Sequence, residues 1–278
     1  MALIRMDIFS RCLMRTVPVT AIVPVDNVRY EGEPERPVDM PYKTLFLLNG
    51  LYGNNIDWVC ASNIFEWAQE RNLVVIMPAG ENRFYVDNAA TGEAYGRFIG
   101  EELVERMRRM FPLSRKREDT YICGLSMGGY GAIRNGLKYA HNFGYAAGLS
   151  AAFIKDMIIN APEEDRDYTQ TRKYYESIYG DISQIDGSDM DCETLYLQQK
   201  QAGIELPKLY MAIGTEDFLL EPNRKYKDFL KAQDADFIYE EGPGEHNFKF
   251  WNEYLGHVLD WLPLEGKAAG ISSGNVKR

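Results

Sequence analysis

Gly124-Leu-Ser-Met-Gly128 follows a short apolar run, Thr120-Tyr-Ile-Cys123, and opens a helical stretch that ends near Ala140. A G-x-S-x-G motif between a strand and a helix places its serine on a sharp, strained turn, with the hydroxyl pointing out of the sheet. The positions two before and two after the serine crowd this turn, and the two glycines of the motif supply the small residues that it needs. A glycine-rich turn with an incidental serine is the simpler alternative, but the flanking strand and helix favour a nucleophile at Ser126.

The chain around this motif alternates between short apolar runs and helical segments. Continuous apolar runs are typical of strands buried on both faces, and their alternation with helices is typical of a mostly parallel sheet. The N-terminal part is rich in strand-forming residues and predicts antiparallel strands that end at Pro24. We therefore expect an α/β fold with strands at residues 7–25, 43–48, 73–77, 120–123, 145–150, 208–213 and 236–240, and with helices at 58–68, 96–111, 129–140, 222–233 and 249–262.

We expect residues 1–264 to form a single domain, followed by a flexible C-terminal tail at residues 265–278. A polar stretch rich in proline and glycine, residues 31–37, predicts a turn. Residues 152–206 interrupt the alternation with polar, helical sequence that is too long for a connecting loop. This segment is either a helical insertion on the surface or a cover over the mouth of the active site.

The composition limits the partners of the protein. The 278 residues carry a formal net charge of -10, which disfavours binding to nucleic acid and to anionic membrane surfaces. No apolar run approaches the roughly 18 residues that span a bilayer, and the N-terminus lacks the basic and then apolar order of a signal peptide. The four cysteines lie far apart and are typical of reduced thiols, so we expect a cytoplasmic protein. The sequence leaves open whether copies of the chain form a homo-oligomer.

A serine hydroxyl is a weak nucleophile at neutral pH. It needs a base within hydrogen-bond reach and a carboxylate that orients the base. In one recurring chain order the serine is followed by an acid and then by a histidine, and each partner lies just after a strand. We expect the acid at Asp217, after the strand at 208–213, with Glu216 as its immediate rival. An acidic turn exposed to solvent is the simpler interpretation of this pair.

Only three histidines are candidates for the base. His246 ends the loop Gly242-Pro-Gly-Glu-His246, which follows the strand at 236–240 and can present an imidazole. His257 falls within the last helix, and His141 ends the helix after the serine, where its charge is favourable. His246 is therefore the expected base. The scarcity of histidine also argues against a His-rich metal site, and we expect neither a metal nor a cofactor.

Acyl transfer needs two backbone N–H groups directed at the oxyanion of the tetrahedral intermediate. Met127, the residue after the expected nucleophile, supplies one of them. The turn Leu48-Asn-Gly-Leu-Tyr-Gly53 supplies the other, because Gly50 lets the backbone turn inward and Leu51 becomes the donor. Several aromatic residues near strand ends are candidates for the substrate pocket, with core packing as an equal alternative: Tyr52, Phe84, Tyr85 and Phe218.

The chain resembles the esterase D-like α/β hydrolases over residues 8–262. The resemblance rests on the serine motif, the turn at 48–53 and the loop at 242–246, together with Met77-Pro-Ala-Gly-Glu-Asn-Arg-Phe-Tyr85 and Gly214-Thr-Glu-Asp-Phe218. That family holds tributyrin esterases, S-formylglutathione hydrolases and feruloyl or acetyl-xylan esterases, and the tributyrin esterase branch is the most similar. The resemblance implies an α/β-hydrolase fold with helices on both faces of the sheet. One departure is Asn49, where the family usually has histidine, although an asparagine can still hydrogen-bond to hold the turn. By position, the resemblance makes these residues the triad and the oxyanion donors: Ser126, Asp217 and His246, with Leu51 and Met127.

These features predict a serine carboxylesterase that cleaves short-chain acyl esters of small molecules through an acyl-enzyme. Enzymes with the same three residues remain as alternatives: an S-formylglutathione hydrolase, a carbohydrate acetyl or feruloyl esterase, and an acyltransferase. The sequence after Gly50 does not match the S-formylglutathione hydrolases, which usually have a cysteine nearby. A catalytically silent binding protein on a hydrolase fold is the alternative from another class, and the ordered Ser, Asp and His argue against it.

Overall fold

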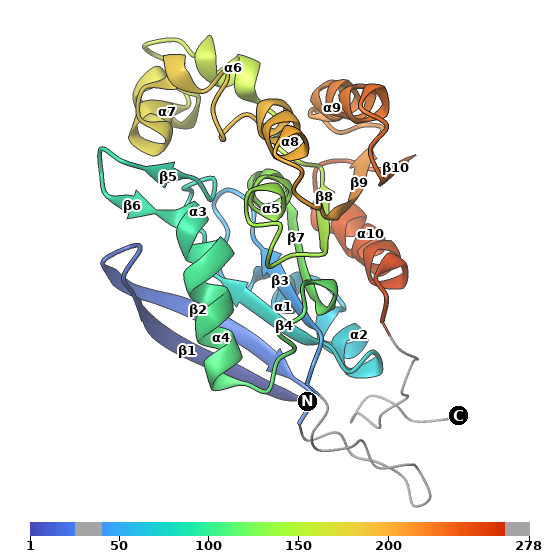
Figure 1. The fold of residues 1–278 in the computed structure, drawn as a ribbon. Coiled ribbons are helices and arrows are strands. Elements are labelled where there is room, and N and C mark those ends of the chain that lie inside the picture. The colour runs from blue at the N-terminus through green and yellow to red at the C-terminus, as the bar shows by residue number, and fades with distance from the viewer. Residues whose placement is uncertain (26–40, 265–278) are drawn as a thin grey trace, which may run out of the picture.

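The computed structural model describes residues 1–25 and 41–264, which are organised around one eight-stranded sheet (Figure 1). The strand order is β1-β2-β4-β3-β7-β8-β9-β10. β1 and β2 form an antiparallel hairpin and β2 pairs antiparallel with β4, whereas the other neighbouring strands are parallel. The predicted α/β-hydrolase arrangement, mostly parallel with antiparallel N-terminal strands, is confirmed. The strands are β1 (Ala2–Ser10), β2 (Arg15–Val23), β3 (Thr44–Leu48), β4 (Val74–Pro78), β7 (Thr120–Leu125), β8 (Tyr145–Leu149), β9 (Lys208–Gly214) and β10 (Phe237–Gly242).

Burial explains the two kinds of strand sequence. Every residue of β3, β4 and β7 is buried, as their continuous apolar runs predict for strands covered on both faces. β1 alternates between half-buried and exposed side chains because it forms one edge of the sheet. The central strands therefore provide a rigid base, and the loops at their carboxyl ends are available for chemistry.

Helices cover both faces of the sheet and enclose two apolar cores (Figure 1). On one face, Trp58, Ile64 and Leu255 pack with alternate residues of the strands. On the other face, Ile99, Met107 and Ile133 belong to the larger core. The first face is covered by α1 (Asp57–Ala61), α2 (Ile64–Glu70) and α10 (Phe248–Trp261), and the second by α3 (Tyr95–Arg97), α4 (Leu103–Met110), α5 (Met127–Lys138) and α9 (Leu220–Ala232).

Two features on the second face escaped the sequence analysis. The helix expected at 96–111 contains one π-helical turn, Phe98–Glu102, between α3 and α4. A short hairpin, β5 (Asp87–Asn88) with β6 (Glu93–Ala94), precedes it. Strands of two residues carry no periodicity that a sequence pattern can reveal.

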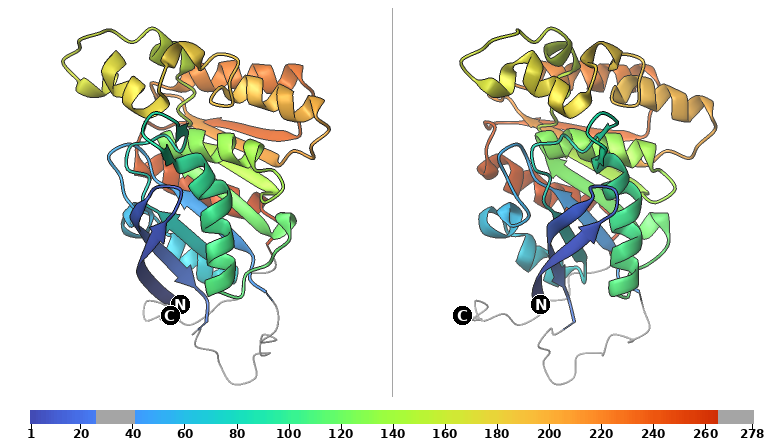
Figure 2. Two further views of the ribbon diagram at one scale, coloured as in Figure 1. Left: turned by 60° about the vertical axis from the view of Figure 1, so that its left-hand side comes forward. Right: turned by 90° about the vertical axis from the view of Figure 1, so that its left-hand side faces the viewer.

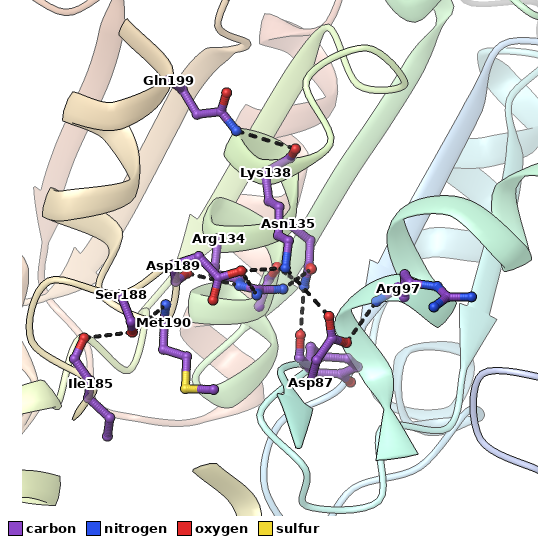
Figure 3. Close-up of polar contacts among 12 residues, drawn as sticks. Asp87, Arg97, Arg134, Asn135, Lys138, Ile185, Ser188, Asp189, Met190 and Gln199 are labelled. Atoms are coloured by element: carbon purple, nitrogen blue, oxygen red, sulfur yellow. Dashed lines mark hydrogen bonds and ion pairs between the residues drawn. The ribbon is translucent and has the colours of Figure 1, made fainter. Parts of the chain in front are cut away.

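The segment 152–206 lies at the end of the molecule away from the N-terminus, next to α5 and α9 (Figures 1 and 2). An ion pair attaches this segment to α5. The Arg134 guanidinium, which has no exposed surface, lies 2.9 Å from the half-buried Asp189 carboxylate, and Lys138 binds the same carboxylate (Figure 3). An arginine so buried needs its partner, because an uncompensated buried charge costs several kcal/mol. The segment contains α6 (Lys155–Ile159), α7 (Arg172–Tyr179) and α8 (Cys192–Gln201), with single 3₁₀ turns at Tyr168–Gln170 and Ile182–Gln184.

The predicted turn at 31–37 and the predicted tail at 265–278 lie outside the described residues. In the part of the chain that the structure describes, none of the helices has the length and apolar character that crossing a membrane requires.

Candidate active site

Ser126 occupies the tight turn between β7 and α5, with φ 53° and ψ −118°. This positive φ is strained for a residue with a side chain, and strain of this kind concentrates at functional sites. A Cβ on Gly124 would collide with the backbone of Gly128, and one on Gly128 would come within 2.5 Å of the Asn49 carbonyl oxygen. Both positions of the motif therefore require glycine. The Ser126 N–H donates to the Leu149 carbonyl at 2.9 Å, which fixes the turn to the neighbouring strand.

Three polar side chains from distant parts of the sequence meet at this turn. The Ser126 Oγ lies 3.0 Å from His246 Nε2, and His246 Nδ1 lies 2.8 Å from Asp217 Oδ2. Asp217 follows β9 and His246 follows β10, so both stand at the carboxyl edge of the parallel sheet, as Ser126 does after β7. The chain of contacts from hydroxyl to imidazole to carboxylate has the geometry of a nucleophile, its base and an orienting acid.

The Asp217 side chain has no exposed surface. Burial alone would raise the pKa of this carboxyl, but the hydrogen bonds from His246 and from the Leu219 N–H, 2.9 Å from Oδ1, outweigh it and hold the pKa below its ordinary value. The nearby Ser150 hydroxyl lowers it further. Asp217 is therefore ionised at neutral pH and can stabilise a cationic imidazole.

Glu216, the rival acid, points elsewhere. Its carboxylate accepts from the Gly244 N–H at 2.6 Å and from the Thr215 hydroxyl at 2.8 Å, and these bonds lower its pKa at the surface. It thereby ties the turn after β9 to the loop that carries His246. The geometry separates the two acids in a way that their adjacent sequence positions did not.

The other two histidines lie outside this cluster. His257 is on α10, where its Nδ1 contacts the Glu240 carboxylate at 2.8 Å, and His141 follows α5, where its Nε2 lies 3.2 Å from the Asn142 amide. Both are solvent-exposed. Of the three, only His246 reaches the Ser126 hydroxyl.

Two residues around the imidazole were missed by the sequence analysis. The Trp251 ring packs edge-on against His246 with 4.9 Å between centroids, and its Nε1 donates to the buried Ser150 hydroxyl at 3.0 Å. Ser150 directly follows β8 and has a φ of 46°. No pattern in the sequence links this tryptophan to a serine about a hundred residues earlier.

The turn expected to complete the oxyanion site passes beside the serine. A Cβ on Gly50 would lie 3.5 Å from the Ser126 Cβ, so the backbone there is close to the nucleophile. Leu51 follows in this turn, and Met127 is the first residue of α5, where helical geometry leaves its N–H without a partner inside the helix. Asn49, the departure from the resembling family, is 1% exposed, and its amide donates to the Gly50 carbonyl at 2.8 Å.

The four aromatic residues considered for the pocket divide into two pairs. Tyr52 and Phe218 are 70% and 73% exposed, and the Phe218 ring lies 4.6 Å from the His246 ring, so both can contact a substrate at the surface. Phe84 and Tyr85 are 3% and 0% exposed. Core packing, the alternative considered for these two, describes them better than a pocket wall, because their rings are turned inward.

A partly open cavity of about 400 Å³ lies between the segment 152–206, α5 and α9. Its walls are mainly apolar and include Phe153, Ile158 and Tyr179, and Lys155 and Lys225 stand among its lining residues. The triad residues do not line it, but the Ala152 N–H, at its edge, donates to the Ser126 carbonyl at 3.0 Å. The cavity therefore adjoins the backbone of the Ser126 turn, and the triad side chains do not line it.

Comparison with known proteins places the chain among esterases. Residues 33–262 match the family described as "Putative esterase". An acetyl esterase from Caldicellulosiruptor saccharolyticus is 41% identical over 263 residues, which cover 94% of this chain and 98% of that protein.

Solved structures agree with this placement. FphF from Staphylococcus aureus, a fluorophosphonate-binding serine hydrolase solved with substrate, is 30% identical with a TM-score of 0.81, over 94% of this chain and 98% of that one. The S-formylglutathione hydrolase FrmB of the same organism is also 30% identical, with a TM-score of 0.79 over the same shares. A ferulic acid esterase with 18% identity, a TM-score of 0.73 and coverage of 94% of this chain and 96% of that one shares the fold.

Proposed function

Because the chain belongs to the esterase family and is an ester-hydrolysing serine hydrolase, we propose that it cleaves short-chain acyl esters with Ser126 as nucleophile. His246 is the general base and Asp217 the acid that orients it. The observation that supports this most is the unbroken contact from Ser126 Oγ to His246 Nε2 at 3.0 Å and from His246 Nδ1 to Asp217 at 2.8 Å.

The reaction then proceeds in two half-steps. The Ser126 oxygen bonds to the ester carbonyl carbon while its proton passes to His246 Nε2, and the carbonyl electron pair moves onto the oxygen. The carbon–alkoxide bond breaks as His246 returns the proton to the leaving alcohol. Water repeats the sequence on the acyl-enzyme and releases the carboxylic acid. Asp217 keeps the imidazole in the tautomer whose Nε2 accepts a proton and stabilises its cationic form.

The developing oxyanion is assigned to the backbone N–H groups of Leu51 and Met127. Met127 lies at the N-terminus of α5, where the helix dipole adds a favourable field for negative charge. Tyr52 and Phe218 stand at the exposed mouth, where they contact the substrate.

The acetyl esterase relative supports a small acyl group as the substrate part bound near Ser126. Similarity to an S-formylglutathione hydrolase at 30% identity keeps that thioester as the second candidate. The two are separated by comparing kcat/KM for p-nitrophenyl acetate, butyrate and octanoate, acetylated xylo-oligosaccharides and S-formylglutathione. The second candidate would be favoured if kcat/KM for S-formylglutathione exceeded that for every oxygen ester by more than about tenfold, or about 1.4 kcal/mol in transition-state binding.

Among the histidines, only His246→Ala should abolish hydrolysis. His257→Ala and His141→Ala should retain most of the activity, because these side chains contact Glu240 and Asn142 at the surface. The measurement is kcat/KM for p-nitrophenyl acetate in the three purified variants. An inactive His257→Ala variant beside an active His246→Ala variant would overturn the assignment of the base.

The pH dependence should follow the imidazole. A protonated imidazole cannot accept the Ser126 proton, so kcat/KM should fall as the pH is lowered. The pKa of Asp217 is depressed, so this carboxylate stays charged between about pH 7 and pH 5 and does not itself cause a change in activity over that range. A profile that rises on acidification would contradict this role.

The segment 152–206 should govern acyl length and leave the chemical step intact. Phe153 and Tyr179 line the cavity beside the nucleophile, whereas Tyr168 is 62% exposed. Phe153→Ala and Tyr179→Ala should change the ratio of kcat/KM between octanoyl and acetyl esters, and Leu197→Ala, on the exposed side of α8, is the control. If the ratio moves by less than about threefold in both, roughly 0.7 kcal/mol, the segment plays no part in selecting the acyl group.

A further inference from the structure

The turn that carries Leu51 is held by a strained segment at residues 80–85, which the proposed mechanism does not use. Four of its non-glycine residues have positive φ: Glu81 at 47°, Asn82 at 58°, Phe84 at 50° and Tyr85 at 56°. Such conformations persist only where surrounding structure imposes them, and they are rare for aromatic residues. Their concentration in a segment bonded to the turn that carries Leu51 requires an explanation.

The segment contacts the turn on both sides of Leu51. Before it, Asn49 Oδ1 accepts from the Gly80 N–H at 3.1 Å, and the Tyr85 hydroxyl lies 3.0 Å from the Asn49 carbonyl oxygen and 3.2 Å from its Oδ1. After it, the Tyr52 N–H donates to Asn82 Oδ1 at 2.7 Å. The backbone on either side of Leu51 is therefore held at Asn49 and at Tyr52, each bonded to the same segment.

The strained segment is itself held in place by contacts with α5 and with Tyr179. The Asn135 amide on α5 donates to the Tyr85 carbonyl at 3.0 Å, and a Cβ on Gly80 or on Gly131 would collide with the Tyr85 side chain. Phe84 packs against Tyr130 and Tyr179, with ring centroids 6.2 and 5.6 Å away. Helix α5 also begins at Met127. One helix therefore carries one expected oxyanion donor and supports the segment that holds the other.

We propose that Asn82 and Tyr85 are positioning residues that hold the Leu51 N–H in the orientation needed to bind the oxyanion. The inference rests on the proposed function, since it concerns the same acyl-transfer step. A hole that is preorganised in this way stabilises charge that develops in the transition state and has little effect on substrate binding. Loss of either hydrogen bond should therefore lower kcat and leave KM almost unchanged.

Tyr85→Phe and Asn82→Gly test the proposal with p-nitrophenyl acetate. The first removes one hydroxyl and keeps the ring, and the second removes the acceptor while glycine tolerates the positive φ. We expect kcat to fall by about 10- to 100-fold with KM within about twofold, because small misplacements of a preorganised donor cost this much. Affinity for 1,1,1-trifluorobutan-2-one, which adds to the serine as an oxyanionic hemiketal, should fall by a similar factor.

Matched controls separate positioning from a general loss of packing. Tyr139→Phe removes another buried tyrosine hydroxyl, one without a hydrogen-bond partner in the described residues, and Asn72→Gly makes the same asparagine-to-glycine change at another half-buried residue with a positive φ, 49°. Both should keep wild-type kcat and ketone affinity.

Two outcomes are distinguishable. If Ser126→Ala is inactive but Tyr85→Phe and Asn82→Gly both match their controls within about twofold, the positioning role is wrong and the proposed function stands. If Ser126→Ala is active, the proposed function fails and the positioning role fails with it. Should Tyr85→Phe not fold, Asn82→Gly decides alone, because Asn82 is only half-buried.

Discussion

Ser126→Ala should lower kcat for p-nitrophenyl acetate by about 10⁴ to 10⁶ while the protein remains folded, because removal of a triad member leaves only binding and the oxyanion site. Ser126 makes its fold-defining contacts through the backbone: its N–H binds Leu149, and its carbonyl accepts from Tyr130 and Ala152. Alanine keeps all of these bonds and loses only the hydroxyl.

The control for this variant is its thermal unfolding. The melting temperature should stay close to that of the wild type, since the deleted hydroxyl hydrogen-bonds, within residues 1–25 and 41–264, to the half-buried His246 alone. More than a few per cent of wild-type activity in a correctly folded Ser126→Ala variant would refute the nucleophile assignment.

Asp217→Asn should lower kcat by about 10⁴, the cost of a wrong imidazole tautomer when the orienting carboxylate becomes an amide. The amide would direct an N–H group at His246 Nδ1, which then cannot donate, so Nε2 would carry the proton and could not act as base. Oδ1 can still accept from the Leu219 N–H, so the local turn should persist.

Glu216→Gln is the matched comparison, because it makes the same chemical change one residue earlier. Its carboxylate bonds Gly244 and Thr215 and does not reach the imidazole, so this variant should lose less than about tenfold in kcat. Equal losses in the two variants would mean that the acid is misassigned.

Local constraints in the sequence predict that three polar side chains meet at one edge of the sheet. A Cβ at Gly124 or Gly128 would collide with the backbone, so the strained turn at Ser126 requires glycine at two positions that can be recognised in the sequence. Asp217 and His246 each follow an apolar run, and parallel strands bring their carboxyl ends to one edge. The structure accordingly brings these three residues together.

Other parts depended on contacts that no local pattern encodes. Phe84 and Tyr85 sit near a strand end, but the positive φ of both turns their rings into the core, and only the fold determines that direction. Asn49 was expected to hold its turn by hydrogen bonding, which it does, but its partners Gly80 and Tyr85 come from another segment. Sequence spacing cannot reveal which loop lies against which.

The segment 152–206 shows the same limit. Its polar composition suggested a surface layer, yet Tyr174, Tyr175 and Tyr179 are all buried. These tyrosines pack into the larger core, and the Asp189 carboxylate that fastens the segment pairs with an arginine on α5. The sequence around an acidic residue far from any motif does not indicate which basic residue it pairs with, because the fold determines the partner.

The central claim, that Ser126 is the nucleophile activated by His246, is tested most directly by covalent labelling. Diisopropyl fluorophosphate phosphorylates an activated serine with loss of fluoride, and mass spectrometry of the intact and digested protein locates the adduct. We predict one adduct, on the peptide that contains Ser126, absent from Ser126→Ala and formed far more slowly in His246→Ala. An adduct on any other residue, or labelling of Ser126→Ala at the wild-type rate, would contradict the account.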